Sequence, residues 1–236
     1  MQNPAQIITK TVNIPGVDLS LTFNPQTILM SWGVILVIII LTFILRGPLK
    51  TIPDRRQVFL ESLIMWFDGM TKEALGDRDG RRFLPLILTL FLFILISNWF
   101  SVIPGLISPT RDLNTCLGLG LLVFFISHLW SIRTNGLGRY IARYFKPYWF
   151  MFPSNVFSEI GKALSHSFRL FGNMFAGGII ISVIPVILIR LFKVSGIPLG
   201  ILGMPLVKAF FGLFIGGIQA FVFSMLALTY IAVLKD

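Results

Sequence analysis

Long apolar runs separated by short polar segments dominate the pattern along this chain of 236 residues. Five such runs stand out, at 26–45, 83–108, 116–132, about 168–192 and about 197–234. Each reaches or approaches the roughly 20 apolar residues that a helix needs to cross the hydrocarbon core of a bilayer. The pattern therefore predicts an all-α, polytopic membrane protein with about five membrane helices, built as a single membrane domain over residues 1–236.

The last two runs are longer than one perpendicular crossing requires. The segment 153–167 has helical character with few breakers, so the fourth helix is expected to begin near Pro153. Excess length is accommodated by tilting a helix in the bilayer. We therefore expect a hairpin of two long, strongly tilted helices over residues 153–235.

The basic residues in the polar segments predict the orientation of the chain. Eight lie in 46–82 and four in 133–152, whereas the alternate segments hold four in total. Those four are Lys10, Arg111, Arg190 and Lys193. Because cytoplasmic loops carry the excess of Lys and Arg, segment 1–25 is expected outside. The loop 46–82 and the C-terminus are then expected in the cytoplasm or its equivalent.

Part of the loop 46–82 has an amphipathic pattern. Its apolar residues follow helical spacing, with acids on the other face. These apolar residues are Val58, Leu60, Leu63, Ile64, Phe67 and Met70. The pattern predicts an amphipathic helix at the membrane surface, and a solvated loop helix fits it equally well.

Composition narrows the function further. Apolar residues make up 55% of the chain and charged residues only 13%, far below the quarter usual for soluble domains. The net charge of +10 sits in loops between apolar runs, which argues against nucleic-acid binding. Cys116 is the single cysteine, and we find neither a phosphate-binding glycine loop nor a nucleophilic triad. We expect no cofactor, no metal and no bond-making chemistry in this chain alone, and no cleavable signal in "MQNPAQIITK".

Arg169 is the strongest functional signal, because it lies in the apolar stretch "SHSFRLFGNMFAGG" at 165–178. An ionisable residue at membrane depth usually faces a bundle interior, a cavity or an ion path; the alternative is a structural Arg paired within the chain. Asn173, four residues later, shares its helix face. Gly172, Gly177 and Gly178 would let another helix approach closely.

A second polar position lies in the middle of the last run, at Gln219. Small and polar residues continue its stripe along the helix, namely Gly212, Gly216, Ala220 and Ser224. A buried amide at membrane depth needs hydrogen-bond partners, and ordinary helix packing is the alternative role for this stripe. Lys208 lies eleven residues before Gln219, on the same side of an ideal helix, or it extends to the interface.

Glu159, Lys162 and His166 precede Arg169 in the same predicted helix. Glu159 and Lys162 are three residues apart and can form an ion pair. Glu159 could line a water-filled path toward Arg169, or the pair could be merely interfacial. Histidine is the side chain that titrates near neutral pH, so His166 is a candidate proton relay. His128, the other histidine, lies on a different segment, so no metal site is predicted.

"FRLFGNMFAGG" followed by "IQAFVFSMLALTYIAV" closely resembles subunit a of the rotary F-type ATP synthase. "LPLILTLFLFILISNWFSVIPGL", "SPTRDLNTCLGLGLLVFF" and "IPDRRQVFLE" resemble other blocks of that family in the same order. The resemblance covers most of residues 26–235. It implies a non-catalytic, ion-translocating stator subunit that provides two half-channels to a ring of c subunits.

In this resemblance, Arg169 corresponds to the essential stator arginine, Gln219 to the glutamine that faces it and Asn173 to its helix-mate. The implied partners are the c ring, the peripheral-stalk b subunits, the other synthase subunits and the lipid bilayer. The implied location is a bacterial inner membrane, or the energy-transducing membrane of an organelle that encodes the chain.

The chain departs from the family at Gly178 and Gly212, where many members carry titratable side chains. Glu159, His166 and water could take over this role, or the coupling ion could be Na⁺ rather than H⁺. A stand-alone secondary transporter would need matching halves around a midplane site, which the sequence lacks. A purely structural scaffold predicts that Arg169→Gln is tolerated.

Overall fold

The computed structural model describes residues 10–13, 20–45, 54–103, 105–146, 148–192 and 205–235. Parts of three predicted features lie outside these residues, namely the N-terminal segment, the loop 46–82 and the start of the fifth run. In chain order the helices and strands are β1 (Lys10–Asn13), β2 (Ser20–Phe23), α1 (Pro25–Leu45), α2 (Arg55–Leu75), α3 (Asp77–Phe100), a 3₁₀ turn (Pro109–Arg111), α4 (Leu113–Asn135), α5 (Leu137–Tyr144), a 3₁₀ turn (Trp149–Met151), α6 (Phe152–Phe192), a π-helical stretch (Phe210–Ile215) and α8 (Gly216–Lys235).

The fold class is all-α and polytopic, as predicted. By length and composition, four helices of the described chain can cross a membrane. They are Pro25–Leu45, Asp77–Phe100, Leu113–Asn135 and Pro205–Lys235. The remaining long helix, α6, begins at Phe152 and runs unbroken for 41 residues, which is about 60 Å at 1.5 Å per residue. That is about twice the thickness of the hydrocarbon core.

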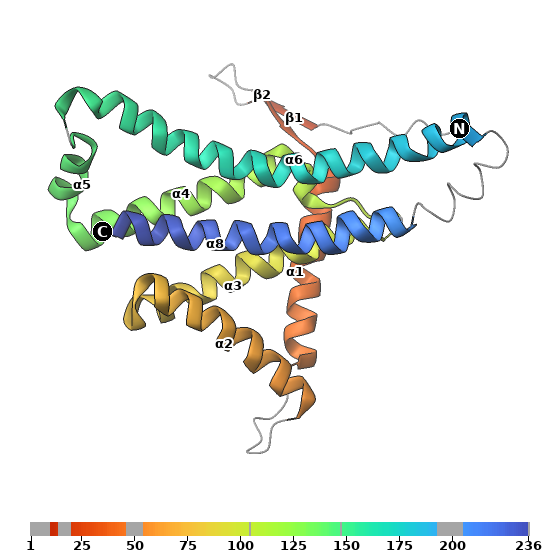
Figure 1. The fold of residues 1–236 in the computed structure, drawn as a ribbon, viewed down its shortest axis with the longest axis horizontal. Coiled ribbons are helices and arrows are strands. Elements are labelled where there is room, and N and C mark those ends of the chain that lie inside the picture. Colours follow the sequence, from red (N-terminus) through yellow and green to blue (C-terminus); the bar gives the residue numbers. More distant parts are fainter. Residues whose placement is uncertain are drawn as a thin grey trace.

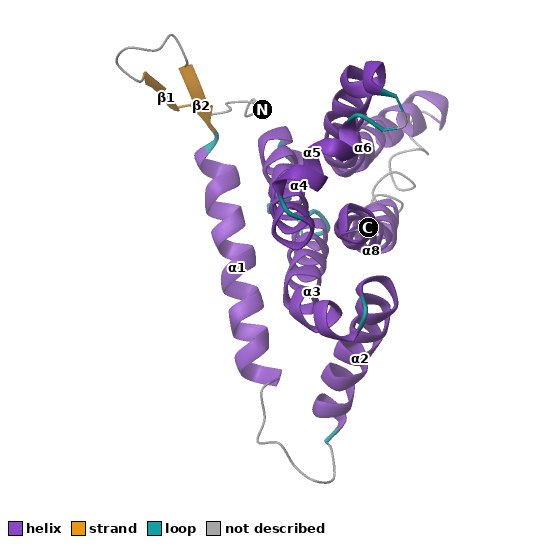
Figure 2. Cartoon of the chain, turned by 90° about the vertical axis from the view of Figure 1, so that its left-hand side faces the viewer, coloured by secondary structure: helices purple, strands orange, loops and turns teal. Residues whose placement is uncertain are grey.

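The long helices α6 and α8 form an antiparallel pair that runs across α1 (Figure 1). After a turn of 90°, α1 is still upright whereas α6 and α8 are seen nearly end-on (Figure 2). A bilayer that α1 crosses therefore holds the α6–α8 pair strongly tilted, in agreement with the predicted hairpin.

The core lies where α8 packs on α3 and α4, with α2 closing one side. Its fully buried side chains include Phe67, Ile87, Ile94, Phe223 and Leu228. Apolar residues of several helices thus meet inside the chain, so the bundle holds itself together without relying on lipid contacts alone.

The predicted amphipathic helix is α2. Its Phe67 is buried in the core, with Leu63 and Met70 packed beside it. Val58 and Ile64 stay exposed, so only part of the predicted apolar stripe contacts the bundle. Gly76, with a φ of 82°, then turns the chain from α2 into α3.

The short strands β1 and β2 precede the first span and were not predicted. They pair antiparallel, with Lys10 opposite Phe23 and Asn13 opposite Ser20. Four residues per strand are too few for an alternating pattern to stand out in the sequence.

Candidate functional site

The centre of the candidate site lies where α6 passes α8. Asn173 of α6 donates a hydrogen bond from Nδ2 to Oε1 of Gln219, at 2.5 Å. Gln219 is only 3% exposed, and its Nε2 finds no partner among the described residues. The structure therefore joins two predicted site residues that are 46 positions apart in the sequence.

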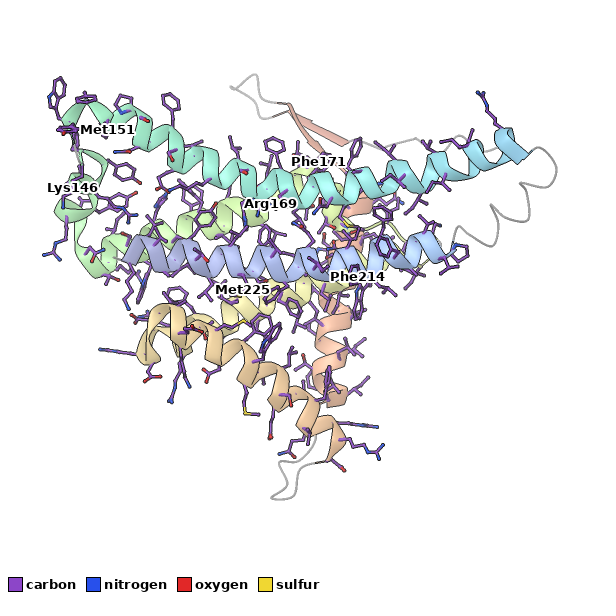
Figure 3. All side chains as sticks on the ribbon, in the orientation of Figure 1. Lys146, Met151, Arg169, Phe171, Phe214 and Met225 are labelled. Atoms are coloured by element: carbon purple, nitrogen blue, oxygen red, sulfur yellow. The ribbon has the colours of Figure 1, made fainter. Side chains whose placement is uncertain are left out.

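Arg169 lies one helical turn before Asn173, near the middle of α6 (Figure 3). Its side chain is exposed, and it makes no hydrogen bond or ion pair with any other residue that the structure describes. No hydrogen bond joins it to Gln219, whose amide oxygen is taken by Asn173. A guanidinium has five N–H donors and does not lose its charge, so Arg169 presents an uncompensated cation beside the Asn173–Gln219 pair.

The stripe of small and polar residues around Gln219 faces the inside of the chain. Gly212, Gly216, Gln219, Ala220 and Ser224 are all buried. A Cβ atom at Gly216 would lie 2.8 Å from Cβ of Asn98, and one at Gly212 would lie 2.3 Å from Cγ2 of Val102. The stripe thus serves helix packing against α3, which was one of the two predicted roles.

Asn98 of α3 fixes the junction between the π-helical stretch and α8. It is fully buried and donates from Nδ2 to the carbonyl of Gly216 at 2.9 Å. Its Oδ1 accepts from the hydroxyl of Thr110 at 2.6 Å. One amide therefore holds α3, the start of α8 and the loop before α4 together. Its partner at the start of α8, Gly216, lies three residues before Gln219.

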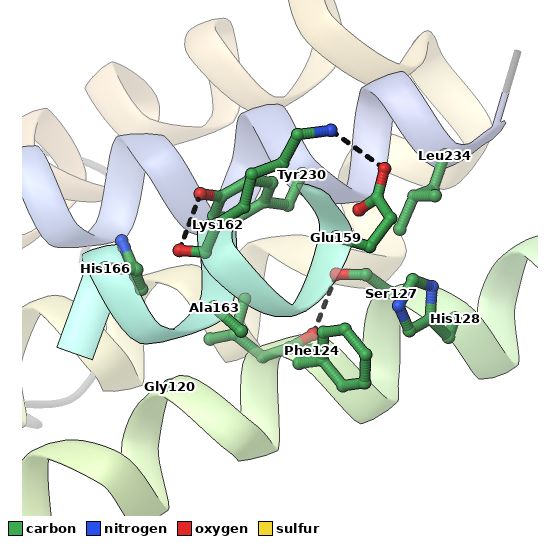
Figure 4. A pocket seen from close by; sticks show the side chains of 11 residues that line it. Gly120, Phe124, Ser127, His128, Glu159, Lys162, Ala163, His166, Tyr230 and Leu234 are labelled. Carbon is green, nitrogen blue, oxygen red and sulfur yellow. Dashed lines mark hydrogen bonds and ion pairs between the residues drawn. The ribbon is translucent and has the colours of Figure 1, made fainter. Parts of the chain in front are cut away.

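A small cavity lies on one side of Arg169 and is called the Glu159 cavity here. It holds about 10 Å³, close to the space of a single water molecule, and α4, α6 and α8 line it (Figure 4). Nζ of Lys162 lies 2.8 Å from Oε1 of Glu159, and the Tyr230 hydroxyl donates to the carbonyl of Lys162 at 3.2 Å. Two separate polar contacts, one to the side chain and one to the backbone of Lys162, thus lie at its wall, and the predicted Glu159–Lys162 pair is confirmed.

Both histidines line the Glu159 cavity. His166 is 3% exposed, and its ring centroid lies 3.8 Å from that of Phe223. Its ring nitrogens, like those of His128, have no hydrogen-bond partner among the described residues. The sequence did not predict that His128 lies near His166, because the two residues are on different segments and no helical period relates α4 to α6. The described residues contain no group of three or more His, Cys, Asp or Glu that could hold a metal ion.

Close packing of α4 on α6 produces this arrangement. A Cβ atom at Gly120 would lie 2.0 Å from Oγ of Ser167. Because Gly120 has no side chain, the two helices approach closely and bring His128 and Glu159 to the same cavity.

A larger cavity lies on the other side of Arg169 and is called the Arg111 cavity here. It holds about 270 Å³, and its wall includes Asn173, Gly178, Lys208 and Arg111. Arg111 comes from the loop between α3 and α4 and was counted in the sequence only as a loop charge. Along α6, residues 159–166 face one cavity and residues 173–181 the other, so Arg169 lies between them.

The predicted glycines of α6 differ in their surroundings. Gly177 faces Phe211, whose Cδ1 would lie 3.2 Å from an added Cβ atom, and Gly178 faces Arg111. Around Gly172 nothing described lies within 4 Å of such an atom. Close approach within the chain therefore explains two of the three glycines.

Comparison with known proteins identifies relatives over nearly the whole chain. The family described as "ATP synthase A chain" matches residues 28–232. The chain is 34% identical to "ATP synthase subunit a" of Acidothermus cellulolyticus over 221 residues, covering 91% of this chain and 78% of the relative. It is 35% identical to "ATP synthase subunit a" of Moorella thermoacetica over 207 residues, covering 88% of this chain and 89% of the relative. For the protein of the same name from Desulforamulus reducens the identity is 31% over 215 residues, with coverage of 91% and 80%.

Proposed function

The chain belongs to the ATP synthase A chain family, and on this premise we propose that it is the ion-translocating stator subunit of a bacterial F-type ATP synthase. Family membership gives it a role in the membrane-embedded Fo sector of that complex. In our proposal it provides two half-channels to a ring of c subunits and couples ion flow to rotation. The b subunits of the peripheral stalk are further proposed contacts.

The observation that carries the proposal is an uncompensated Arg169 between two separate cavities. Neither cavity wall includes Arg169, whereas both approach it along α6. Two cavities on opposite sides of one fixed cation fit the arrangement that a two-half-channel stator requires. A single continuous pore would short-circuit the ion gradient.

Arg169 can act on a passing rotor by electrostatics alone. A guanidinium in a low-dielectric site favours the ionised form of a nearby carboxylate. A ring carboxylate that reaches Arg169 therefore gives up its ion before it passes, and the same charge repels cations that would cross between the cavities. One elementary charge moving through 100 mV yields about 2.3 kcal/mol, so several ions per turn supply the work of ATP synthesis.

The neighbouring residues have supporting roles in this proposal. Asn173 is held by buried Gln219 and positions the polar face of α6 beside Arg169. Glu159 and His166 line the Glu159 cavity and pass protons through it. The coupling ion is H⁺ in the main proposal and Na⁺ in its alternative.

The orientation follows from the charges of the loops. The segment 133–152 is rich in basic residues and leads directly into the Glu159 end of α6. We therefore assign the Glu159 cavity to the cytoplasmic side of a bacterial inner membrane and the Arg111 cavity to the outside. The N-terminus is then outside and the C-terminus inside; an organelle membrane is the alternative location.

The test is Arg169→Ala in the assembled complex, reconstituted in vesicles. We expect the variant to assemble but to lose both ATP synthesis and ATP-driven ion pumping. Arg139→Ala, which removes an exposed Arg on α5, is the matched control and is expected to retain both. Normal pumping by Arg169→Ala would reject the stator role, and a tolerated Arg169→Gln would favour a structural scaffold.

A further inference from the structure

We propose that Arg111 is a specificity-determining residue of the Arg111 cavity, where its guanidinium excludes metal cations and admits protons only by exchange with cavity water. This inference rests on the proposed function, because it assumes that the Arg111 cavity is one of the two half-channels. It also gives a physical reason for the absence of a side chain at position 178.

The guanidinium of Arg111 occupies the space that a side chain at position 178 would need. A Cβ atom added at Gly178 would lie 3.0 Å from Nη2, 3.1 Å from Cζ and 3.2 Å from Nε of Arg111. A longer side chain at 178 would have to displace the guanidinium. The guanidinium of Arg111 thus occupies the space beside α6 that a side chain at position 178 would fill.

Arg111 is held by a rigid turn. Buried Thr110 donates to Oδ1 of Asn98 at 2.6 Å, and its carbonyl accepts from the Cys116 thiol at 3.1 Å. The Ser108 and Thr110 hydroxyls lie 2.6 Å apart, in hydrogen-bond contact. Since the neighbouring residue is anchored on three sides, the backbone of Arg111 has a defined position at the cavity wall.

The charged side chains in the described part of this wall are both cations. Arg111 and Lys208 line the cavity, and no described residue of the lining is Asp, Glu or His. The segment 193–204, outside the described residues, contains no acid in its sequence. Within the described chain, neither Arg111 nor Lys208 forms an ion pair.

A metal cation meets two barriers in such a cavity. It is repelled by the two fixed charges of Arg111 and Lys208. It also finds no carboxylate ligand among the described residues of the wall, whose side-chain oxygens are those of Asn173 and Ser101, and a hard cation needs oxygen ligands after losing its water. Na⁺ is therefore excluded from the path.

A proton can use this cavity without entering it as a free cation. An ionised ring carboxylate takes a proton from a cavity water, which leaves the neutral acid and one hydroxide. Arg111 and Lys208 stabilise that hydroxide until a proton from the outer solution converts it back to water. The two steps sum to the transfer of one proton from the outer solution to the carboxylate, and each step conserves charge.

The electric potential of the cavity can be measured with charged thiol reagents. In the assembled complex, Cys116→Ser removes the native thiol but keeps a hydrogen-bond donor toward the Thr110 carbonyl, and Ile181→Cys adds a thiol to the cavity lining. The ratio of modification rates by a cationic and an anionic methanethiosulfonate is compared among variants. We expect this ratio to rise several-fold in Arg111→Gln, to rise less in Lys208→Gln and to stay unchanged in Arg139→Gln. An unchanged ratio in Arg111→Gln overturns the proposal.

The effect on ion specificity is measured by ATP synthesis in vesicles under an imposed proton gradient. NaCl on the side of the Arg111 cavity is compared with choline chloride at equal ionic strength. We expect Na⁺ to leave the wild type and Arg111→Lys unaffected and to slow Arg111→Gln several-fold. Sodium-independent synthesis by Arg111→Gln, or uptake of radioactive sodium by the wild type, overturns the proposal.

Two of these variants keep the test decisive. If Arg111→Gln does not assemble, Arg111→Lys retains the charge and Lys208→Gln removes the second one without touching the turn at Thr110. Failure of the proposed function has a separate signature, namely coupled transport in Arg169→Ala. The thiol measurement does not depend on transport, so it tests the cavity charge in either case.

Discussion

The two cavities along α6 differ in size and in chemistry. The Glu159 cavity holds about 10 Å³ between carboxylate, ammonium, imidazole and phenol groups. The Arg111 cavity holds about 270 Å³, and its described charged groups are an Arg and a Lys. In the proposed function, one helix therefore supports two modes of ion transfer: titratable side chains relay protons where space is short, and water relays them where glycines leave room.

Glycines determine the size of both cavities, but in opposite ways. Gly120 lets α4 and α6 close together, which shrinks the Glu159 cavity around its polar groups. Gly178 keeps the Arg111 cavity open and leaves space for a guanidinium. A larger side chain at Gly120 or at Gly178 is therefore expected to affect the two cavities in different ways.

We expect the largest effect from Gly120→Leu. An added Cβ atom would lie 2.0 Å from Oγ and 3.3 Å from Cβ of Ser167, and 3.4 Å from the carbonyl oxygen of Ala163, so the α4–α6 contact leaves no room for the rest of a leucine side chain. Overpacking of this kind costs about 1–3 kcal/mol or more. The melting temperature of the purified complex should fall, and little complex should be recovered. Gly118→Leu, where nothing described lies within 4 Å of the added Cβ atom, should melt like the wild type; equal melting of both variants would contradict the packing.

A smaller but specific effect is expected from Gly178→Leu. The added side chain displaces Arg111 and fills the Arg111 cavity, so ion transport should be lost while the complex still assembles. Gly178→Ala is the graded control, because its Cβ atom meets only the flexible end of Arg111 and should reduce transport slightly. Full proton pumping by Gly178→Leu would show that this cavity is not on the ion path.

The smallest effect is expected from Glu159→Gln. This change breaks the pair with Lys162 and removes one titratable group, while His166 and water remain at the cavity. ATP-driven proton pumping should slow several-fold without being abolished. Glu73→Gln on the exposed face of α2 should have no effect. Pumping at the wild-type rate in both variants would remove Glu159 from the proposed path.

Much of the fold could be predicted from the sequence, because apolar length and helical period are local properties. The long helix from Pro153, the tilted hairpin and the Asn173–Gln219 neighbourhood all follow from spacing and resemblance. The bond between Asn173 and Gln219 itself depends on how closely α6 approaches α8, which only the structure provides.

Contacts between helices account for the features that were missed. His128 joins His166 at one cavity because Gly120 lets α4 meet α6. Lys208 was expected either on the side of Gln219 or extended to the interface. It lines the Arg111 cavity together with Gly212, a member of the Gln219 stripe, and the π-helical stretch Phe210–Ile215 changes the residue count per turn between Lys208 and Gln219. Arg111 could not be found from periodicity, since it lies in a loop.

The uninterrupted length of α6 has a mechanical consequence. A stator experiences a sideways load from the rotor that it drives, and a break in the helix between the cavities would act as a hinge. Because Phe152–Phe192 is one continuous helix, we expect such a load to displace both ends of the proposed ion path as a single stiff body. The offset between the proposed entry and exit is then kept constant under torque.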